Sequence, residues 1–361
     1  MAAAEQIEDG IEALIARVSG KPVAMLMLAR TLLLPRGKTL RALSLSEEAL
    51  ALSPDDPQVK ALAQMIRSRC VGKWYFTMVQ DQNRHALYAK AFRKVLTPGC
   101  TVLDIGAGTG LFAMLAAREG AAKVIACERD PAVAEAARET VFRNGYSDRV
   151  SVIAKDSREL RIGVDLEAPA DILLWDNLSN DLISAGAADA LEDARRRLVK
   201  TGAAIIPQSA EVRVALVDAE PGCGLEMQAA EGFDLSAFNR FRPTQLTLSR
   251  SRSTRRSEAG TILDFDFTRD EVLAQGRGQV EVSATGGRVL GIAQWLRFHL
   301  ADGVTYDTGD DEDVTAFGLQ YHAVNPFDPA PGQMIAIDGA HDRHGMWFWI
   351  NDLPTCSEPR R

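Results

Sequence analysis

The spacing of hydrophobic positions changes twice along this 361-residue chain. Up to about residue 70 it is helical, with two amphipathic segments separated by a Ser-Pro-Asp-Asp-Pro turn at 53–57. From 71 to 207, short apolar runs alternate with helical patterns, beginning with TVLDIGAG and LFAMLAAREG. From 208 onward, short alternating segments such as EVRVALV and TILDFDF are separated by turn residues. We therefore expect three units, at 1–70, 71–207 and 208–361.

Each spacing predicts an architecture. The strand–helix alternation predicts an α/β unit, a doubly wound, Rossmann-like parallel sheet that binds ligands at the carboxyl ends of its strands. The third unit is expected to be a β-barrel or sandwich. The first is expected to be a helical hairpin packed on the next unit or a partner-binding module. Its segment EEALALSPDDPQVKALAQMI resembles part of a tetratricopeptide repeat.

Composition excludes several classes of protein. Apolar residues make up 46% of the chain and charged residues 25%, as in ordinary globular domains. Acidic residues number 49 and basic residues 41, and the resulting net charge of −8 disfavours nucleic acid as a partner. Five dispersed cysteines without a C-x-x-C pair disfavour a disulfide framework or a zinc site. Because no apolar run reaches the roughly 18 residues of a membrane span, we expect a cytoplasmic protein without membrane contact.

A glycine-rich segment after the first predicted strand carries the clearest chemistry. Asp104-Ile-Gly106-Ala-Gly108-Thr-Gly110 follows the run TVL and leads into the helical pattern LFAMLA. Glycines let the backbone turn sharply and approach a ligand closely. The N-terminus of the following helix presents free N–H groups to a negative group. This arrangement predicts a cofactor site.

Two further strand ends complete that site. Glu128 ends the second predicted strand, where a carboxylate can accept hydrogen bonds from ribose hydroxyls. Asp156 and Ser157 end the third, where an adenine can be recognised. A nicotinamide dinucleotide site usually shows G-x-G-x-x-G, but here the third glycine comes one residue early. The order D-x-G-x-G-x-G resembles motif I of class I methyltransferases, which implies S-adenosyl-L-methionine as cofactor and S-adenosyl-L-homocysteine as product. The alternatives are a nicotinamide site and an empty nucleotide fold.

The segment before the first strand narrows the resemblance. This segment contains Trp-Tyr75-Phe, then Met78 through Arg84, and then Tyr88. It resembles the N-terminal helix of protein arginine methyltransferases, in which an aromatic pair precedes M-L-x-D-x-x-R-x-x-x-Y. The resemblance covers about 72–352. It implies that Arg84 pairs with the cofactor carboxylate, for which a planar guanidinium is suited. It also implies that Tyr75 and Met78 contact the cofactor.

The match to that family changes at the acceptor loop. The family holds the acceptor guanidinium between two glutamates on the loop after the fourth strand. Here Asp176 takes the first position and Ala185 takes the second, where no cation can be bound. Asp181 lies between them and is a candidate replacement. Asn177 and Asn180 are candidates for contact with the acceptor.

A second departure concerns the T-H-W loop of the family. Its counterpart is the stretch LQYHAVNPF at 319–327, which is expected to be a loop beside the active site. Gln320 stands where the family histidine would be and Tyr321 where the tryptophan would be. His322, one place beyond them, is a candidate general base with a pKa near neutrality. Tyr321 and Asn325 are candidates to line the acceptor pocket.

These observations predict an S-adenosylmethionine-dependent N-methyltransferase. Asp176, Asp181 and His322 are the predicted catalytic residues. The expected acceptor is a guanidino nitrogen of a protein arginine or of a small guanidino compound such as free arginine. The segment GFDLSAFNRF at 232–241 resembles the dimerisation arm of the family and implies a homodimer. Because Ala185 replaces a glutamate, a methyltransferase for another acceptor and a cofactor-binding pseudoenzyme scaffold stay open.

Overall fold

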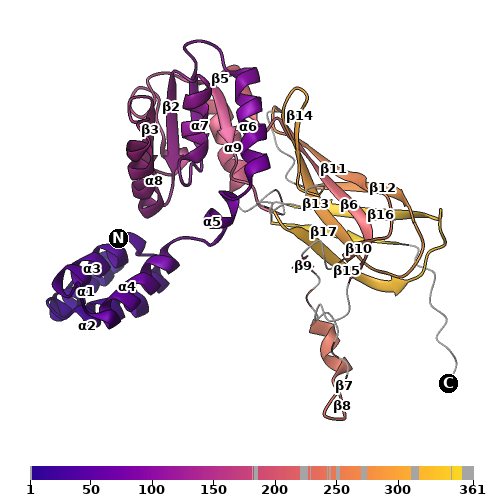
Figure 1. The fold of residues 1–361 in the computed structure, drawn as a ribbon, viewed down its shortest axis with the longest axis horizontal. Coiled ribbons are helices and arrows are strands. Elements are labelled where there is room, and N and C mark those ends of the chain that lie inside the picture. Colours follow the sequence, from indigo (N-terminus) through magenta and orange to yellow (C-terminus); the bar gives the residue numbers. More distant parts are fainter. Residues whose placement is uncertain are drawn as a thin grey trace.

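The computed structural model describes residues 2–180, 182, 186–219, 227, 229–241, 243, 245–248, 253–269, 275–309, 317–342 and 344–351 (Figure 1). In this part of the chain, no helix is both long enough and apolar enough to cross a membrane. The α-helices are α1 (Ala2–Val18), α2 (Pro22–Leu28), α3 (Thr39–Leu52), α4 (Pro57–Cys70), α5 (Trp74–Met78), α6 (Gln82–Val95), α7 (Leu111–Glu119), α8 (Pro131–Arg143) and α9 (Ala187–Arg197). Short helices of other types are η1 (Ala29–Leu33), η2 (Leu34–Arg36), η3 (Ser157–Glu159) and η4 (Ser236–Phe241).

The helices α1 to α4 form an N-terminal bundle, seen apart from the rest of the chain in Figure 1. The bundle has a hydrophobic cluster of its own, which includes Leu26, Leu45 and Ile66. Helix α4 begins after Asp56, whose carboxylate accepts hydrogen bonds from two backbone N–H groups of the first turn. The predicted helical extension is confirmed. The tetratricopeptide resemblance and a partner for the bundle stay predictions.

A five-stranded sheet follows the bundle. Its strands are β1 (Thr101–Ile105), β2 (Lys123–Glu128), β3 (Val150–Ala154), β4 (Ala170–Trp175) and β5 (Val199–Ile206). They are all parallel, in the order β3-β2-β1-β4-β5. Helices α6 to α9 pack around the sheet, and strand runs such as VLDI are buried, as parallel strands covered by helices require. The predicted Rossmann-like sheet is confirmed.

The C-terminal part is a curled antiparallel barrel. Its strands are β6 (Ser209–Ala219), β9 (Gln245–Leu248), β10 (Ser253–Arg255), β11 (Gly260–Asp266), β12 (Gly276–Ser283), β13 (Val289–Ala301), β14 (Val304–Asp307), β15 (Leu319–Phe327), β16 (Met334–His341) and β17 (Met346–Trp349). One sheet runs β10-β6-β13-β15-β9, with β11 beside β6 and β14 beside β13, and a second runs β12-β16-β17. A separate small arm holds β7 (Ala229–Ala230), β8 (Phe233–Asp234) and η4. The predicted barrel is confirmed.

The stretch 319–327 is strand β15 and not the loop expected from the sequence. It pairs antiparallel with β13 and, on its other side, with β9. Leu319, Tyr321 and Ala323 alternate with Gln320 and His322, and Leu319 to His322 are all buried. This alternation suits a strand that is covered on both faces better than an exposed loop.

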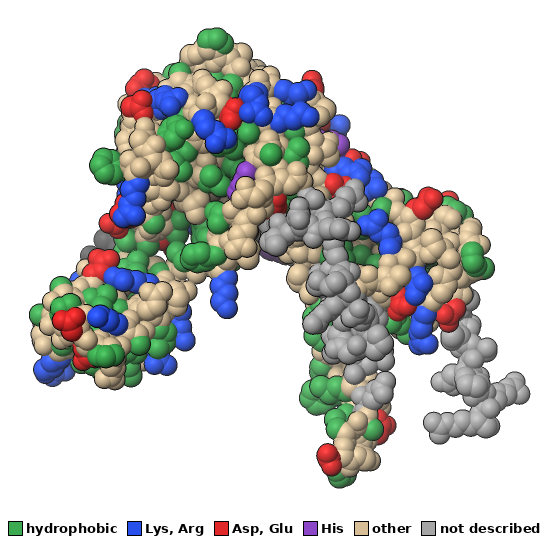
Figure 2. Space-filling model, viewed as in Figure 1, with side chains coloured by type: hydrophobic (Ala, Val, Ile, Leu, Met, Phe, Trp, Pro, Cys, Tyr) green, Lys and Arg blue, Asp and Glu red, His purple; other side chains and the backbone are tan. Residues whose placement is uncertain are grey.

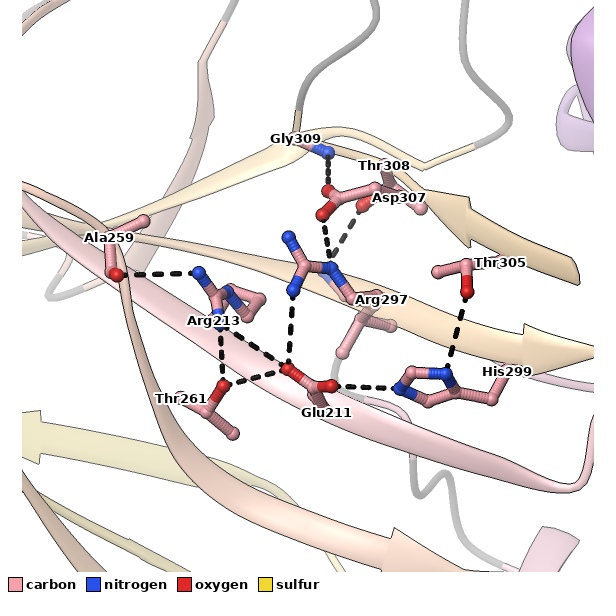
Figure 3. A network of polar contacts seen from close by, with 11 residues as sticks. Glu211, Arg213, Ala259, Thr261, Arg297, His299, Thr305, Asp307, Thr308 and Gly309 are labelled. Carbon is pink, nitrogen blue, oxygen red and sulfur yellow. Dashed lines mark hydrogen bonds and ion pairs between the residues drawn. The ribbon is translucent and has the colours of Figure 1, made fainter. Parts of the chain in front are cut away.

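The long strands β6 and β13 present two different faces. Val212, Leu216 and Leu296 point into the main hydrophobic core. On the opposite face, Ala215, Ala293 and Trp295 belong to a smaller apolar cluster. Beside it lies a polar network (Figure 3), in which Glu211 lies 2.8 Å from His299 Nε2 and accepts a hydrogen bond from Thr261 at 2.7 Å. Because successive side chains of a strand face opposite sides, even-numbered positions of β13 point into the barrel.

The main hydrophobic core is continuous from the parallel sheet into the barrel. It contains Leu103 and Leu174 from the sheet together with Leu216 and Phe298 from the barrel. Helix α6 lies between the two parts and contacts β13 and β14. The barrel is therefore packed directly against the helix that leads into the cofactor site.

Candidate active site

A cavity of about 490 Å³ opens at the carboxyl ends of the parallel strands. It is covered on one side by α5 and by the start of α6. The predicted cofactor residues that line it are Tyr75, Met78, Arg84, Asp104, Gly106, Gly108, Glu128, Asp156 and Ser157. Gly110 does not line the cavity. It precedes α7 with a φ of +79°, and a Cβ there would contact Val141 at 3.4 Å.

The glycine loop allows a ligand to approach the backbone. Gly108 has a φ of +53°, and a Cβ at this position would lie 3.0 Å from the ring of Tyr75. Its N–H donates a hydrogen bond to Glu128 Oε2 at 3.0 Å, and the other oxygen of Glu128 accepts from the N–H of Asp130 at 2.8 Å. Glu128 is thus held in a fixed position at the end of β2.

Asp104 has an unsatisfied carboxylate oxygen in the wall of the cavity. Its side chain is 2% exposed, and Oδ2 has no hydrogen-bond partner. Burial, with a smaller contribution from Glu128, raises the pKa of Asp104 to about 8. A bound ligand with an ammonium or hydroxyl donor would satisfy this oxygen. The site therefore fits the amino-acid end of S-adenosylmethionine.

The far end of the cavity contains a pair that the sequence did not predict. Arg158 donates hydrogen bonds from Nε and Nη2 to the two oxygens of Asp156, at 2.8 and 2.7 Å. This pairing lowers the pKa of Asp156 to about 2. Asp156 is therefore a permanent anion at neutral pH.

Asp176 lies in the cavity wall after β4, where two side chains of α6 hold it. Arg84 forms an ion pair with one of its oxygens, and the Tyr88 hydroxyl donates to the other at 2.5 Å. The ring of Phe112 stacks on Tyr88 at 4.3 Å and lies 4.6 Å from the guanidinium of Arg84. Burial raises the pKa of Tyr88 to about 12, so it is a neutral donor. The sequence could have indicated this contact, because Tyr88 follows Arg84 by four residues and residues four apart lie on the same face of a helix.

The start of α6 is bound to the barrel through Asp81. This residue caps the helix by accepting a hydrogen bond from the N–H of Arg84 at 2.8 Å. Its other carboxylate oxygen accepts a hydrogen bond from the hydroxyl of Tyr306 on β14. A barrel strand thus contacts the helix turn that carries Arg84.

The predicted acceptor residues do not all reach the cavity. Asn177 lines it, whereas Asn180 does not. Asn180 bonds to the barrel instead, because its Oδ1 accepts from the N–H of Gly318 at 3.0 Å and its carbonyl accepts from Gln294 Nε2 at 3.0 Å. Asp181 and Ala185 lie outside the described residues.

The structure places the three predicted residues of β15 away from this cavity. His322 is 6% exposed inside the barrel, with its ring 4.7 Å from that of Phe348. Burial lowers its pKa to about 4, so it is not a base with a near-neutral pKa. Tyr321 faces the opposite side and donates to the carbonyl of Leu290. Asn325 is exposed beyond both. The described lining of the cavity includes none of the three.

Comparison with known sequences gives the same class of enzyme. A model of the ribosomal protein L11 methyltransferase family (PrmA) matches residues 86–207. The arginine N(omega)-methyltransferase of Streptomyces achromogenes subsp. streptozoticus is 34% identical over 276 residues, which cover 74% of each chain. Protein arginine N-methyltransferase 7 of Oryza sativa subsp. indica is 37% identical over 153 residues, and the match covers 40% of this chain but 21% of that protein.

Solved structures share the fold. The Trypanosoma brucei PRMT1 enzyme–prozyme heterotetrameric complex with AdoHcy matches with a TM-score of 0.67 at 21% identity, over 78% of this chain and 94% of that one. The structure of PRMT6-SAH matches with a TM-score of 0.60 at 17% identity, over 77% and 99%. Together with the relative that covers three quarters of both chains, these observations show that the chain belongs to the protein arginine methyltransferase family and is an S-adenosylmethionine-dependent methyltransferase.

Proposed function

We propose that the protein methylates an Nω guanidino nitrogen of arginine and that its main acceptor is free arginine. The observation that carries this proposal is the carboxylate of Asp176, held at the cavity wall next to the cofactor residues. A relative that matches 74% of this chain at 34% identity is named for arginine and not for protein arginine. A single acid, in place of two glutamates, suits a small acceptor that brings its own carboxylate and ammonium groups.

The proposed reaction gives Asp176 the task of orienting the acceptor. When bound, S-adenosylmethionine would supply a methyl group on its sulfonium sulfur. The lone pair of a guanidino nitrogen attacks the methyl carbon, so that an N–C bond forms, the C–S bond breaks with both electrons going to sulfur, and the methylated acceptor releases one proton to solvent. A carboxylate has about four lone-pair sites, and Arg84 and Tyr88 use two of those of Asp176. The remaining sites accept N–H bonds from the acceptor and aim its free nitrogen. Catalysis then comes mainly from positioning.

Protein arginine is the second candidate acceptor. Relatives named protein arginine N-methyltransferase 7 match this chain at 36 to 37% identity over about 40% of its length. The chain spans 21% to 51% of the length of such relatives, so their acceptors need not apply here. An N-terminal helical bundle with its own core would suit the recruitment of a protein.

Transfer of isotope-labelled methyl groups, followed by mass spectrometry, tests the proposal. The acceptors are free arginine and an arginine-rich peptide. Asp176→Asn retains the shape of the side chain but removes its charge, so we expect kcat/KM for arginine to fall about a hundredfold or more. Asp156→Asn, at the opposite end of the cavity, is the matched control and should change the affinity for the cofactor instead.

The outcomes separate the candidates. Methylarginine formed from free arginine and lost in Asp176→Asn supports the proposal. Methylation of the peptide alone would move the assignment to protein arginine. Binding of S-adenosylhomocysteine without transfer to either acceptor would contradict both.

We also propose a cytoplasmic homodimer, with domains at 1–70, 71–207 and 208–361. The arm supports the dimer because Phe233, Phe238 and Phe241 are 71%, 60% and 69% exposed there. Figure 2 shows hydrophobic side chains gathered along this projecting segment.

The cytoplasmic location is supported by the cysteines. Three described cysteines are free, which fits a reducing compartment.

A further inference from the structure

A buried amide lies on the inner face of barrel strand β13. Gln294 of β13 is 0% exposed, between Ile292 and Leu296, which belong to the main hydrophobic core. It is a polar residue at a position where an apolar one would pack. Because packing alone does not require an amide here, its hydrogen bonds indicate its role.

The contact that Gln294 makes leads to the loop that carries Asp176. Within the stretch between β4 and α9, we call residues 176–180 the acceptor loop. Nε2 of Gln294 donates a hydrogen bond to the carbonyl of Asn180 at 3.0 Å. Asn180 Oδ1 accepts from the N–H of Gly318 at 3.0 Å. Two bonds from the barrel thus hold Asn180, while Arg84 and Tyr88 hold Asp176.

The other end of the amide is unsatisfied. Oε1 of Gln294 is buried and has no hydrogen-bond partner. A buried acceptor without a partner is destabilising, and an apolar side chain of similar shape would avoid that loss. Glutamine at this position provides the hydrogen bond to Asn180, which an apolar residue could not form.

The backbone just after the acceptor loop is in a conformation that its own residue disfavours. Leu182 has a φ of 57°, in the left-handed region, and its side chain is buried. Its N–H donates to the carbonyl of Ser179 at 2.9 Å, which closes a tight turn. A conformation of this kind persists only when the surrounding contacts impose it. The position of the loop therefore depends on what holds it from outside.

We infer that Gln294 is a positioning residue for acceptor binding. It acts through Asn180 and sets where the acceptor loop, and with it Asp176 and Asn177, meets the cavity. The inference rests on the proposed function, because it assumes that the loop receives the acceptor. It predicts that the residue governs the affinity for the acceptor and not that for the cofactor.

Two variants of the 361-residue protein test this inference. Gln294→Met retains the length of the side chain and removes the donor. We expect the KM for arginine to rise about tenfold, kcat to change less, and the Kd of S-adenosylhomocysteine to stay within twofold. The melting temperature should change little, because removal of the unsatisfied oxygen offsets the loss of the donor to the carbonyl of Asn180. Amide hydrogen exchange should become faster in peptides covering 176–180 and stay unchanged in those covering β1 and β2.

The second variant and a control make the result decisive. Gln294→Glu replaces the donor with a carboxylate that repels the carbonyl of Asn180, so the KM should rise at least as much. Ser257→Ala removes another buried barrel bond, from the N–H of Leu216 at 2.9 Å, without touching the acceptor loop. This control should lower the melting temperature and leave the KM and loop exchange unchanged.

Three results would overturn the inference: unchanged exchange of the loop in Gln294→Met, equal changes in KM and in cofactor Kd, or a lower KM in Gln294→Glu. The last would mean that the side chain contacts the cationic acceptor directly. Failure of the proposed function is distinguishable, because it appears in the wild-type protein as absent arginine methylation. Loop exchange reports on Gln294 whatever the acceptor is.

Discussion

At the residue scale, the buried carboxyl group of Asp104 makes stability depend on pH in a direction unusual for an aspartate. Its pKa is raised from 3.8 to about 8 in the folded protein. Between these values the folded state holds a proton that the unfolded chain has lost. The free energy of unfolding contributed by this group is therefore fully present below pH 3.8 and is lost as the pH rises towards 8.

The variant Asp104→Asn isolates this effect. We expect it to be more stable than the wild type at pH 8, with the difference shrinking as the pH falls towards 4, because the amide cannot ionise. Above pH 8, where the wild-type group is ionised, the affinity of the variant for S-adenosylhomocysteine should be about a hundredfold lower than that of the wild type, because an amide does not pair with the ammonium group of the ligand. Thermal unfolding and calorimetry across and above this pH range measure both. A wild-type stability that rises from pH 5 to 8 relative to the variant would contradict the burial argument.

At the scale of elements, helix α6 depends on the barrel for its position. Tyr306→Phe removes the bond between β14 and the carboxylate of Asp81 that caps the helix. Because the same helix turn carries Arg84, we expect the Kd of S-adenosylhomocysteine to rise about three- to tenfold, as for loss of one bond to a charged group. Titration calorimetry measures this change.

A matched control is available on the opposite face of the barrel. Tyr321 is also buried and donates to a backbone carbonyl of the barrel, that of Leu290. Tyr321→Phe should destabilise the protein without weakening cofactor binding. Equal effects of the two substitutions on the Kd would show that Tyr306 has only a general structural role.

The elements that the sequence predicted well were those with strong local signals. Composition marks three consecutive segments: the run TVLD, the glycine loop and the helical pattern LFAMLA. In the structure these are β1, the loop at the cofactor cavity and α7. Contacts between distant elements were not predictable. Nothing local marks Gln294 as a partner of Asn180, or Tyr306 as a partner of Asp81. The faces of β15 were also hidden, because a shift of one residue moves His322 from one side of the sheet to the other.

At the scale of the whole molecule, the arm predicts the oligomeric state. Light scattering should give about twice the 39.2 kDa of one chain. The double variant Phe238→Ser with Phe241→Ser removes two adjacent exposed rings, 5.6 Å apart, and should be monomeric at micromolar concentration. Trp347→Ser, a similar loss of exposed aromatic surface on β17, should remain dimeric. A monomeric wild type would contradict the proposal.

The continuous core between the sheet and the barrel has a consequence for how such proteins can be recombined. Residues of both parts fill one hydrophobic interior, so neither part can be exchanged for that of a relative without repacking the shared side chains. The N-terminal bundle, which keeps its apolar residues in an interior of its own, faces no such restriction. The parallel sheet and the barrel therefore have to be transferred together in a chimeric protein. The N-terminal bundle can be exchanged separately, with the junction between α4 and α5.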